Sequence, residues 1–233
     1  VCEMNIDAYL NPEYGIYDYL TAQKKAGRIR HLGFSAHGSY DVVKRFLDAY
    51  GKDMEFCQLQ LNYLDWKFQG GKEKVELLNE WNIPVWVMEP LRGGRLASLA
   101  EEDEAVLKEL RPDEKIPAWA FRFLQSVPSV TMVLSGMSSM EQLQENIRTY
   151  AEDRPLNEKE KEALMSVADR MLEKKVLPCT ACHYCVSHCP QELDIPELLA
   201  LYNEHCFTEG GFIAPMALSS YPKEKLPSAC MIK

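Results

Sequence analysis

The sequence predicts an α/β fold, because short apolar stretches alternate with amphipathic stretches along the first 150 residues. Strands that are joined by single helices pair in parallel through right-handed crossovers. Each expected strand also gives way to a polar or glycine-bearing segment, as strands do at the active-site edge of a (β/α) barrel. A third observation is that the cysteines concentrate after residue 175, which predicts a second unit of different chemistry.

The strands and helices of the first unit follow one another in order from residue 14. The expected strands are 31–35, 56–61, 83–88 and 130–134, and the expected helices are 14–27, 40–50, 72–81, 116–125 and 139–150. The helices place apolar residues three and four positions apart, as Val43, Phe46 and Leu47 illustrate. About four βα units are half of an eight-stranded barrel. We therefore expect the C-terminal half of a (β/α)8 TIM barrel, with the other half outside this sequence.

A charged segment follows the barrel half. Residues 151–175 carry one apolar stripe, which includes Leu164 and Val167, and they predict a surface helix that leads out of the domain. Pro178 would end that helix. We expect a partial barrel over 1–155, a linker helix over 156–175 and a small, mostly helical unit over 176–233.

Composition and charge exclude several classes of function. The 26 Lys and Arg residues against 35 Asp and Glu residues give a net charge of -9, which disfavours nucleic acid and anionic membranes as partners. No apolar run is long enough to cross a bilayer. The chain begins with Val1 without a secretory leader and ends at Lys233 without a helix stop, so we expect a cytoplasmic protein that is cut at both ends.

Four cysteines with short spacings give the strongest local signal. The run Cys179-x2-Cys182-x2-Cys185-x3-Cys189, followed by Pro190, has the spacing of bacterial ferredoxin [4Fe–4S] ligands. In that pattern the first three thiolates bind one cluster and the fourth binds a second cluster. Cys230 stands where a matching second run would begin, so two clusters are expected in the intact protein. Structural zinc and a disulfide framework remain the alternatives, although both suit this spacing less well.

Four motifs at barrel spacing resemble the aldo/keto reductase family, in particular bacterial members with a C-terminal two-cluster, ferredoxin-like iron–sulfur extension. The motifs fall at the fifth to eighth strands of that family's barrel. They are residues 27–37 (GRIRHLGFSAH), 57–62 (CQLQLN), 89–94 (EPLRGG), and 135–136 (SG) with 141–146 (EQLQEN).

The resemblance implies a nicotinamide dinucleotide cofactor and assigns residues to it. Ser35 and Gln58 would hold the nicotinamide carboxamide. Pro90, Leu91 and Gly93 would pass their backbone along the diphosphate, and Arg92 would add charge there. Ser135 and Gly136 would lead to the adenosine side, and Glu145 and Asn146 would contact adenine. Met137, Ser138 and Ser139 stand where NADP-preferring relatives often carry Arg or Lys, so the choice between NAD and NADP stays open.

Each of these residues also has an ordinary structural interpretation. Ser35 would end a strand, Gln58 would be a hydrogen-bonded polar group of the barrel interior, and Gly93 with Gly94 would form a turn. Glu145 with Asn146 would lie on a solvated helix face. The resemblance places the catalytic Tyr, Lys, Asp and His on the first four strands, so no catalytic residue is assigned within this chain, His37 included.

Three functions follow as alternatives. The first is an iron–sulfur oxidoreductase with NAD(P)-linked carbonyl or alcohol chemistry and electron transfer through its clusters, inactive in this chain alone. The second is an electron-transfer module whose barrel docks a ferredoxin or flavodoxin without binding a nucleotide. The third is a zinc-binding interaction protein.

Overall fold

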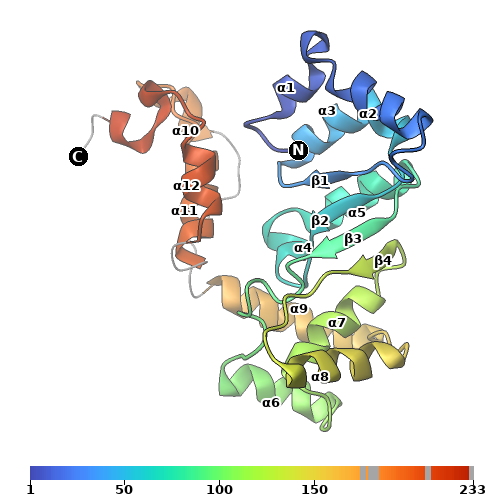
Figure 1. Ribbon diagram of the computed structural model, residues 1–233. Coiled ribbons are helices and arrows are strands. Elements are labelled where there is room, and N and C mark those ends of the chain that lie inside the picture. The colour runs from blue at the N-terminus through green and yellow to red at the C-terminus, as the bar shows by residue number, and fades with distance from the viewer. Residues whose placement is uncertain (174–176, 178–183, 208–210, 231–233) are drawn as a thin grey trace. The chain divides into compact units, whose positions relative to one another are not determined.

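The computed structural model describes residues 1–173, 177, 184–207 and 211–230, which form two compact units (Figure 1). The first unit is Val1–Ala168 and the second is Asp169–Lys233. The division falls within the helix α9 (Glu158–Glu173), inside the segment 156–175 that the sequence suggested as a linker. Among the described residues, no helix combines the length and the apolar character needed to cross a membrane.

A four-stranded parallel sheet forms the centre of the first unit. Its strands are β1 (Phe34–Ala36), β2 (Cys57–Gln60), β3 (Val85–Met88) and β4 (Val130–Val133), hydrogen-bonded in that order. Each strand lies within the range expected from the sequence or within one residue of it. The predicted α/β fold with parallel strands is therefore confirmed.

The two faces of the sheet differ in character. Side chains on one face are buried, such as Cys57 and Val85 at 0% exposure. The alternate positions are only half-buried, and they include Gln58 and Trp86, which stand opposite each other in the parallel register. Phe56 stacks on Trp86 on this second face, with ring centroids 3.9 Å apart. Neighbouring residues of a strand point to opposite faces. Polar side chains such as Gln58 therefore lie together on the second, half-buried face of the sheet.

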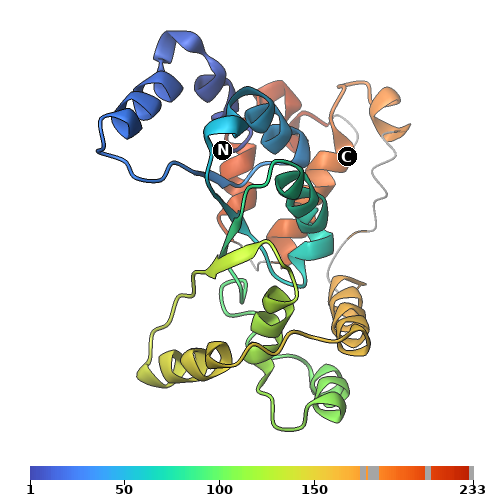
Figure 2. The ribbon, with the colours of Figure 1, turned by 90° about the vertical axis from the view of Figure 1, so that its right-hand side faces the viewer.

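Helices cover the buried face and extend past both edges of the sheet. The helices of this unit before α9 are α1 (Ile6–Leu10), α2 (Ile16–Lys25), α3 (Tyr40–Tyr50), α4 (Asp65–Phe68), α5 (Gly71–Glu80), α6 (Glu101–Leu110), α7 (Ile116–Gln125) and α8 (Met140–Ala151). Helices α1 to α3 gather on the β1 side, and α6 to α8 gather on the β4 side (Figures 1 and 2). Short 3-10 turns lie at Pro12–Tyr14 and Gly51–Asp53.

Helix α7 is apolar on nearly all sides and forms part of the core. Trp119 and Phe121 are each 1% exposed, and Leu124 is completely buried. Arg122 is also buried, and its guanidinium Nη1 donates to the carbonyl oxygens of Thr149 at 2.8 Å and Glu152 at 2.7 Å. Those carbonyls lie at the C-terminal end of α8, where backbone acceptors lack helical partners. Arg122 therefore ties α7 to the end of α8.

Some helices differ from the expectation. The short helices α1 and α4 were not predicted. The charged segment 151–175 is helical only from Glu158, where α9 begins, two residues after the expected start of the linker helix at 156, and Pro155 separates it from α8. The helix α6 was not predicted, since only Asp103 and Leu107 of it are buried and it lacks a broad apolar stripe. Four acidic residues in the first turn of α6 stabilise its N-terminus through the helix dipole.

The described residues of the second unit form helices and turns. The helices are α10 (Tyr184–Ser187), α11 (Ile195–Phe207) and α12 (Ile213–Leu218), followed by 3-10 turns at Lys223–Lys225 and Pro227–Ala229. Asn203 of α11 holds the backbone of Leu177, accepting from its N–H at 2.7 Å and donating to its carbonyl at 2.9 Å. The expected mostly helical character is present in this part of the chain.

Candidate functional site

A cavity of about 470 Å³ opens at the C-terminal ends of β3 and β4, beside Gln58 of β2. The sequence-predicted residues that line it are Gln58, Pro90, Leu91, Gly93, Ser135 and Gly136. They come from three separate segments of the chain, and the parallel sheet brings these segments to one edge. The structure thus brings together six of the residues that the motifs had suggested for one ligand.

The loop after β3 forms one wall of the cavity. Its backbone is left-handed at Glu89, Arg92, Gly93 and Gly94, with φ of 56°, 47°, 64° and 89°. The amides of Arg92 and Gly94 close turns on the carbonyls of Glu89 and Leu91, each at 3.0 Å. The amide between them, at Gly93, donates instead to the Glu89 carboxylate at 2.5 Å. The loop is therefore a tight series of turns in which a side chain satisfies the central amide.

A buried polar network holds this loop from below. The Asp65 carboxylate accepts hydrogen bonds from Asn62 at 2.8 Å, from Gln60 at 2.9 Å and from the Arg92 guanidinium at 3.0 Å. Asn62 and Asp65 are completely buried, and Arg92 is 4% exposed. The second amide hydrogen of Asn62 reaches the carbonyl oxygen of Glu89 at 2.9 Å. A buried charge requires hydrogen-bond partners of this kind. These hydrogen bonds together hold the loop after β3 against the segment that follows β2.

Arg92 therefore lies differently from its expected position. The resemblance had suggested that its charge faces the diphosphate of a bound nucleotide. In the structure, its guanidinium turns inward to Asp65 and stacks over the Phe68 ring, with the guanidinium carbon 5.4 Å from the ring centroid. The physical reason is that Asp65 is a completely buried carboxylate, which requires a buried cation beside it.

Gln58 presents an amide at the cavity. Its Nε2 atom lies 3.6 Å from the sulfur of Met88, which is a weak contact, so the amide is available to a stronger partner. Ser35 stands opposite Gln58 in the register of β1 and β2. Ser35, however, is among the residues that line a second cavity of about 220 Å³, an apolar one between β1 and the helices α1, α2 and α3.

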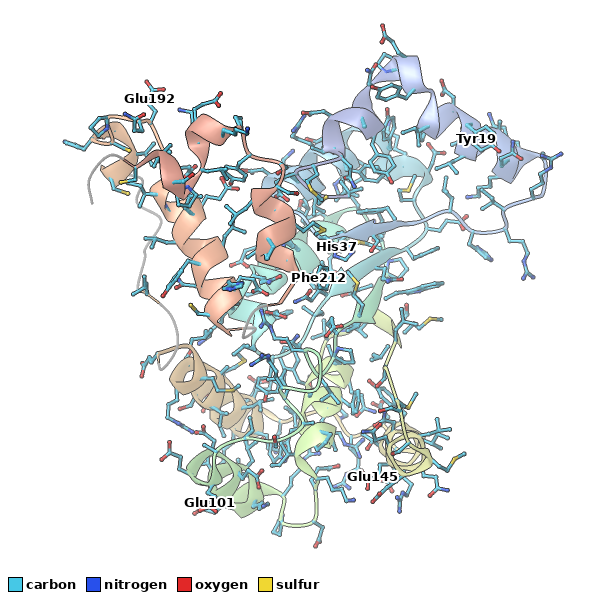
Figure 3. The ribbon with its side chains drawn as sticks, turned by 60° about the vertical axis from the view of Figure 1, so that its left-hand side comes forward. Tyr19, His37, Glu101, Glu145, Glu192 and Phe212 are labelled. Atoms are coloured by element: carbon cyan, nitrogen blue, oxygen red, sulfur yellow. The ribbon has the colours of Figure 1, made fainter. Side chains whose placement is uncertain are left out.

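His37 follows β1, and its imidazole Nε2 lies 3.1 Å from the Ser35 hydroxyl oxygen (Figure 3). Partial burial lowers the pKa of His37, and the positive charge of Lys74 lowers it further. The imidazole is therefore predominantly neutral at neutral pH. This contact is consistent with the interpretation of His37 as a hydrogen-bonded loop histidine.

The loop after β4 forms the remaining wall of the cavity, and helix α8 contacts this loop. Asn146 donates from Nδ2 to the Ser135 hydroxyl at 3.2 Å, which links α8 to the cavity lining. Ser139 caps α8 by accepting from the amide of Gln142 at 3.2 Å. Glu145 lies on α8 (Figure 3), and its carboxylate forms an ion pair with Lys115, just before α7. The two residues expected to contact adenine therefore have different surroundings. Asn146 contacts the cavity lining through Ser135, and Glu145 pairs with Lys115.

The expected cluster ligands are described only in part. Cys179 and Cys182 lie outside the described residues. Cys185 and Cys189 are half-buried, and the Cys189 sulfur accepts a hydrogen bond from the backbone N–H of Leu193 at 3.4 Å. Cys230 is exposed. Within the described part of the chain, no three Cys, His, Asp or Glu side chains form a group that could hold a metal ion.

Three important residues were not assigned a role from the sequence. Asn62 and Glu89 were identified only as polar residues at strand ends, and Asp65 had no predicted role. The available signal was Asn62 itself, because an Asn side chain commonly accepts from backbone amides shortly after it in the chain and so forms an Asx turn. Asn62 does accept from the amides of Leu64 at 3.1 Å and Asp65 at 2.8 Å.

Comparisons with known proteins agree with this arrangement. Residues 7–169 match the sequence model described as "Aldo/keto reductase family". Similar solved structures include the holo form of aldo-keto reductase AKR11C1 from Bacillus halodurans, with 23% identity, a TM-score of 0.52, and coverage of 63% of this chain and 53% of that chain. A second is Gox0644 in its apo form, with 21% identity, a TM-score of 0.54, and coverage of 70% and 56%.

A third similar structure is the thermostable aldo-keto reductase Tm1743 in complex with the inhibitor epalrestat. It shares 19% identity with a TM-score of 0.52 and coverage of 65% of this chain and 53% of that one. This chain therefore spans about half the length of the solved structures that it matches. At these identities the likeness establishes the fold alone. No curated protein matches the chain.

Proposed function

The chain belongs to the aldo/keto reductase family, a family of oxidoreductases, and from that premise we propose that its cavity binds a nicotinamide dinucleotide used in carbonyl and alcohol chemistry. The observation that carries the proposal is the convergence of Gln58, the 89–94 loop and Ser135–Gly136 on one cavity at the C-terminal edge of the sheet. In (β/α) folds this edge is where substrates and cofactors bind.

The residues at the cavity fit such a cofactor. A Cβ atom at Gly94 or Gly136 would meet no atom of the described chain within 4 Å, so the backbone there is open to close approach. Glycine-bearing turns with backbone amides at their surface suit a diphosphate. The Gln58 amide, which carries both a donor and an acceptor, suits a carboxamide. When bound, the dinucleotide would supply or accept the hydride.

Each wall of the cavity then has a specific task. Gln58 would orient the carboxamide, with Ser35 next to it in the register of the sheet. Pro90, Leu91 and Gly93 would lie along the diphosphate, and Arg92 would act indirectly, by holding the loop through Asp65. Ser135 and Gly136 would contact the adenosine part, where Asn146 positions the Ser135 hydroxyl. No residue of this chain is assigned a catalytic role, and we propose that the chain alone binds the dinucleotide without turnover.

For the second unit we propose two [4Fe–4S] clusters in the intact protein. Cys179, Cys182 and Cys185 would bind the first cluster, and Cys189 and Cys230 would contribute to the second. The spacing of the cysteines supports this proposal. A second support is the hydrogen bond that the Cys189 sulfur accepts from the Leu193 backbone N–H, because such hydrogen bonds stabilise thiolates that bind a metal. These clusters would relay single electrons to a ferredoxin or flavodoxin in the cytoplasm.

The proposal is tested by titrating the full chain with NADH and with NADPH while following the nucleotide's fluorescence. Saturable binding that inorganic pyrophosphate weakens supports a diphosphate-binding cavity. If neither nucleotide binds and electrons pass to a flavodoxin, the barrel is a docking scaffold and the nucleotide function is wrong.

A further inference from the structure

We infer that the Glu89 carboxylate is an internal competitor for the diphosphate subsite, so that a bound dinucleotide must displace it from the Gly93 amide. The inference rests on the proposed function. It concerns a residue to which the motifs gave no role, and it follows from the position of one side chain on the cavity wall.

One backbone donor of the loop, the Gly93 amide, is held by a side chain, and that side chain is Glu89. The amides of Arg92, Gly94, Arg95 and Leu96 all close turns on backbone carbonyls within the loop. The Gly93 amide donates to Glu89 Oε2 at 2.5 Å instead. A carboxylate and a phosphate offer the same kind of acceptor, an anionic oxygen, to a backbone N–H. The subsite therefore already contains a negatively charged oxygen.

Displacement of this carboxylate requires only a side-chain rotation. The backbone of Glu89 is held independently, because its carbonyl accepts from Asn62 at 2.9 Å and from the amide of Arg92 at 3.0 Å. Beneath the loop, Asp65 and Arg92 keep their buried ion pair whatever the Glu89 side chain does. Glu89 is exposed, so its carboxylate can move into water while the loop keeps its shape.

Charge repulsion determines whether Glu89 strengthens or weakens dinucleotide binding. The displaced carboxylate stays on the same short loop as the incoming diphosphate, and the two negative charges repel each other. Two unit charges about 4 Å apart in a water-like environment interact by an amount that corresponds to about a fivefold change in affinity. Glu89 should therefore weaken dinucleotide binding, and it should do so less at high ionic strength, which screens exposed charges.

The test measures dissociation constants of NADH and NADPH for the full chain and for two variants, Glu89→Gln and Glu89→Ala. Glutamine keeps an acceptor for the Gly93 amide and removes the charge, whereas alanine removes both. Glu101→Gln is the matched control, because Glu101 is exposed at the start of α6 (Figure 3) and does not line the cavity. We expect both Glu89 variants to bind about fivefold more tightly at low salt, with the gain shrinking in about 0.5 M NaCl.

Each outcome has a defined meaning. Unchanged or weaker binding in both Glu89 variants, while the wild type binds and Gln58→Ala weakens binding, overturns this inference and leaves the dinucleotide site standing. Tighter binding that is equal in Glu101→Gln also overturns it, because net charge alone would then explain the gain. Absence of binding in the wild type and in both Glu89 variants overturns the proposed function together with this inference.

Discussion

The Arg92 guanidinium lies against the Asp65 carboxylate, with Nε 3.0 Å and 3.2 Å from its two oxygens, and both side chains are almost completely buried. This pair connects the loop after β3 to the segment after β2. Because the loop forms a wall of the cavity, the shape of the candidate site depends on an interaction that lies outside it.

Replacing Asp65 by Asn should destabilise the protein strongly. The substitution leaves the Arg92 charge buried without its counter-ion, and breaking such a pair costs about 3 to 5 kcal/mol. Asp48→Asn is the control, since Asp48 forms an exposed ion pair with Lys44, which solvent and salt screen, so that it contributes little to stability. Urea unfolding of the two variants measures the difference. Equal, small losses in both would show that the Asp65 pair does not hold the loop.

Replacement by alanine should lower the stability of the protein at Gly33 but leave it nearly unchanged at Gly136. A Cβ at Gly33 would lie 2.5 Å from the carbonyl oxygen of Phe56, which accepts a hydrogen bond from the amide of Phe34 at the start of the sheet. Gly33→Ala should therefore cost about 1 to 3 kcal/mol through overpacking. Gly136→Ala should leave the stability within about 0.5 kcal/mol. Thermal unfolding checks both, and a loss at Gly136 as large as at Gly33 would contradict the described backbone.

The ion pair between Arg111 and Glu160 predicts a pH dependence. Hydrogen bonds from Arg111 lower the pKa of the Glu160 carboxyl below its usual 4.5. A depressed folded-state pKa stabilises the protein above the unfolded-state pKa, and this stabilisation is lost as the pH falls through the folded-state value. Glu160→Gln should therefore reduce the free energy of unfolding at about pH 7, and the difference from wild type should shrink towards about pH 3.

Glu162→Gln is the matched control for this prediction, because Glu162 is exposed on the same helix. Free energies of unfolding measured across the acid range should show no comparable pH-dependent difference for it. A Glu160→Gln difference that stays constant from neutral to acidic pH would mean that the carboxylate charge does not contribute.

The cysteine assignments predict an iron content. Anaerobic reconstitution of the intact protein should give about eight irons and a brown chromophore, from two four-iron clusters. Four irons that persist in Cys230→Ala and disappear in Cys189→Ala would support a single cluster instead. A colourless protein that contains zinc would favour the interaction-protein alternative.

The sequence predicted the strands well because their signals are local. Apolar stretches bounded by polar and glycine residues placed all four strands, and the parallel pairing followed from the helical segments between them. The helix α6 was missed because its one completely buried apolar residue, Leu107, leaves no periodic pattern. The break between α8 and α9 matches the expected bounds, 139–150 and 156–175, to within two residues.

The site was predicted only in part, because side-chain direction depends on distant partners. Gln58, Gly93 and Ser135 lie at the cavity through backbone position, which the strand ends fix. Arg92 and Glu145 turn towards Asp65 and Lys115, which are 27 and 30 residues away in the chain. No local pattern reveals such pairings, so the sequence alone did not indicate where these two side chains point.

The central claim is that the cavity beside Gln58 binds a nicotinamide dinucleotide. Its most direct test is to measure the dissociation constants of NADPH and of NADH for the Gln58→Ala variant. The matched control is Gln23→Ala on α2, which removes the same type of side chain on the β1 side of the sheet. We predict that Gln58→Ala weakens binding by about 1 to 2 kcal/mol through the loss of an oriented amide, while Gln23→Ala binds like wild type. Unchanged affinity in Gln58→Ala would contradict the placement of the nicotinamide beside Gln58 of β2.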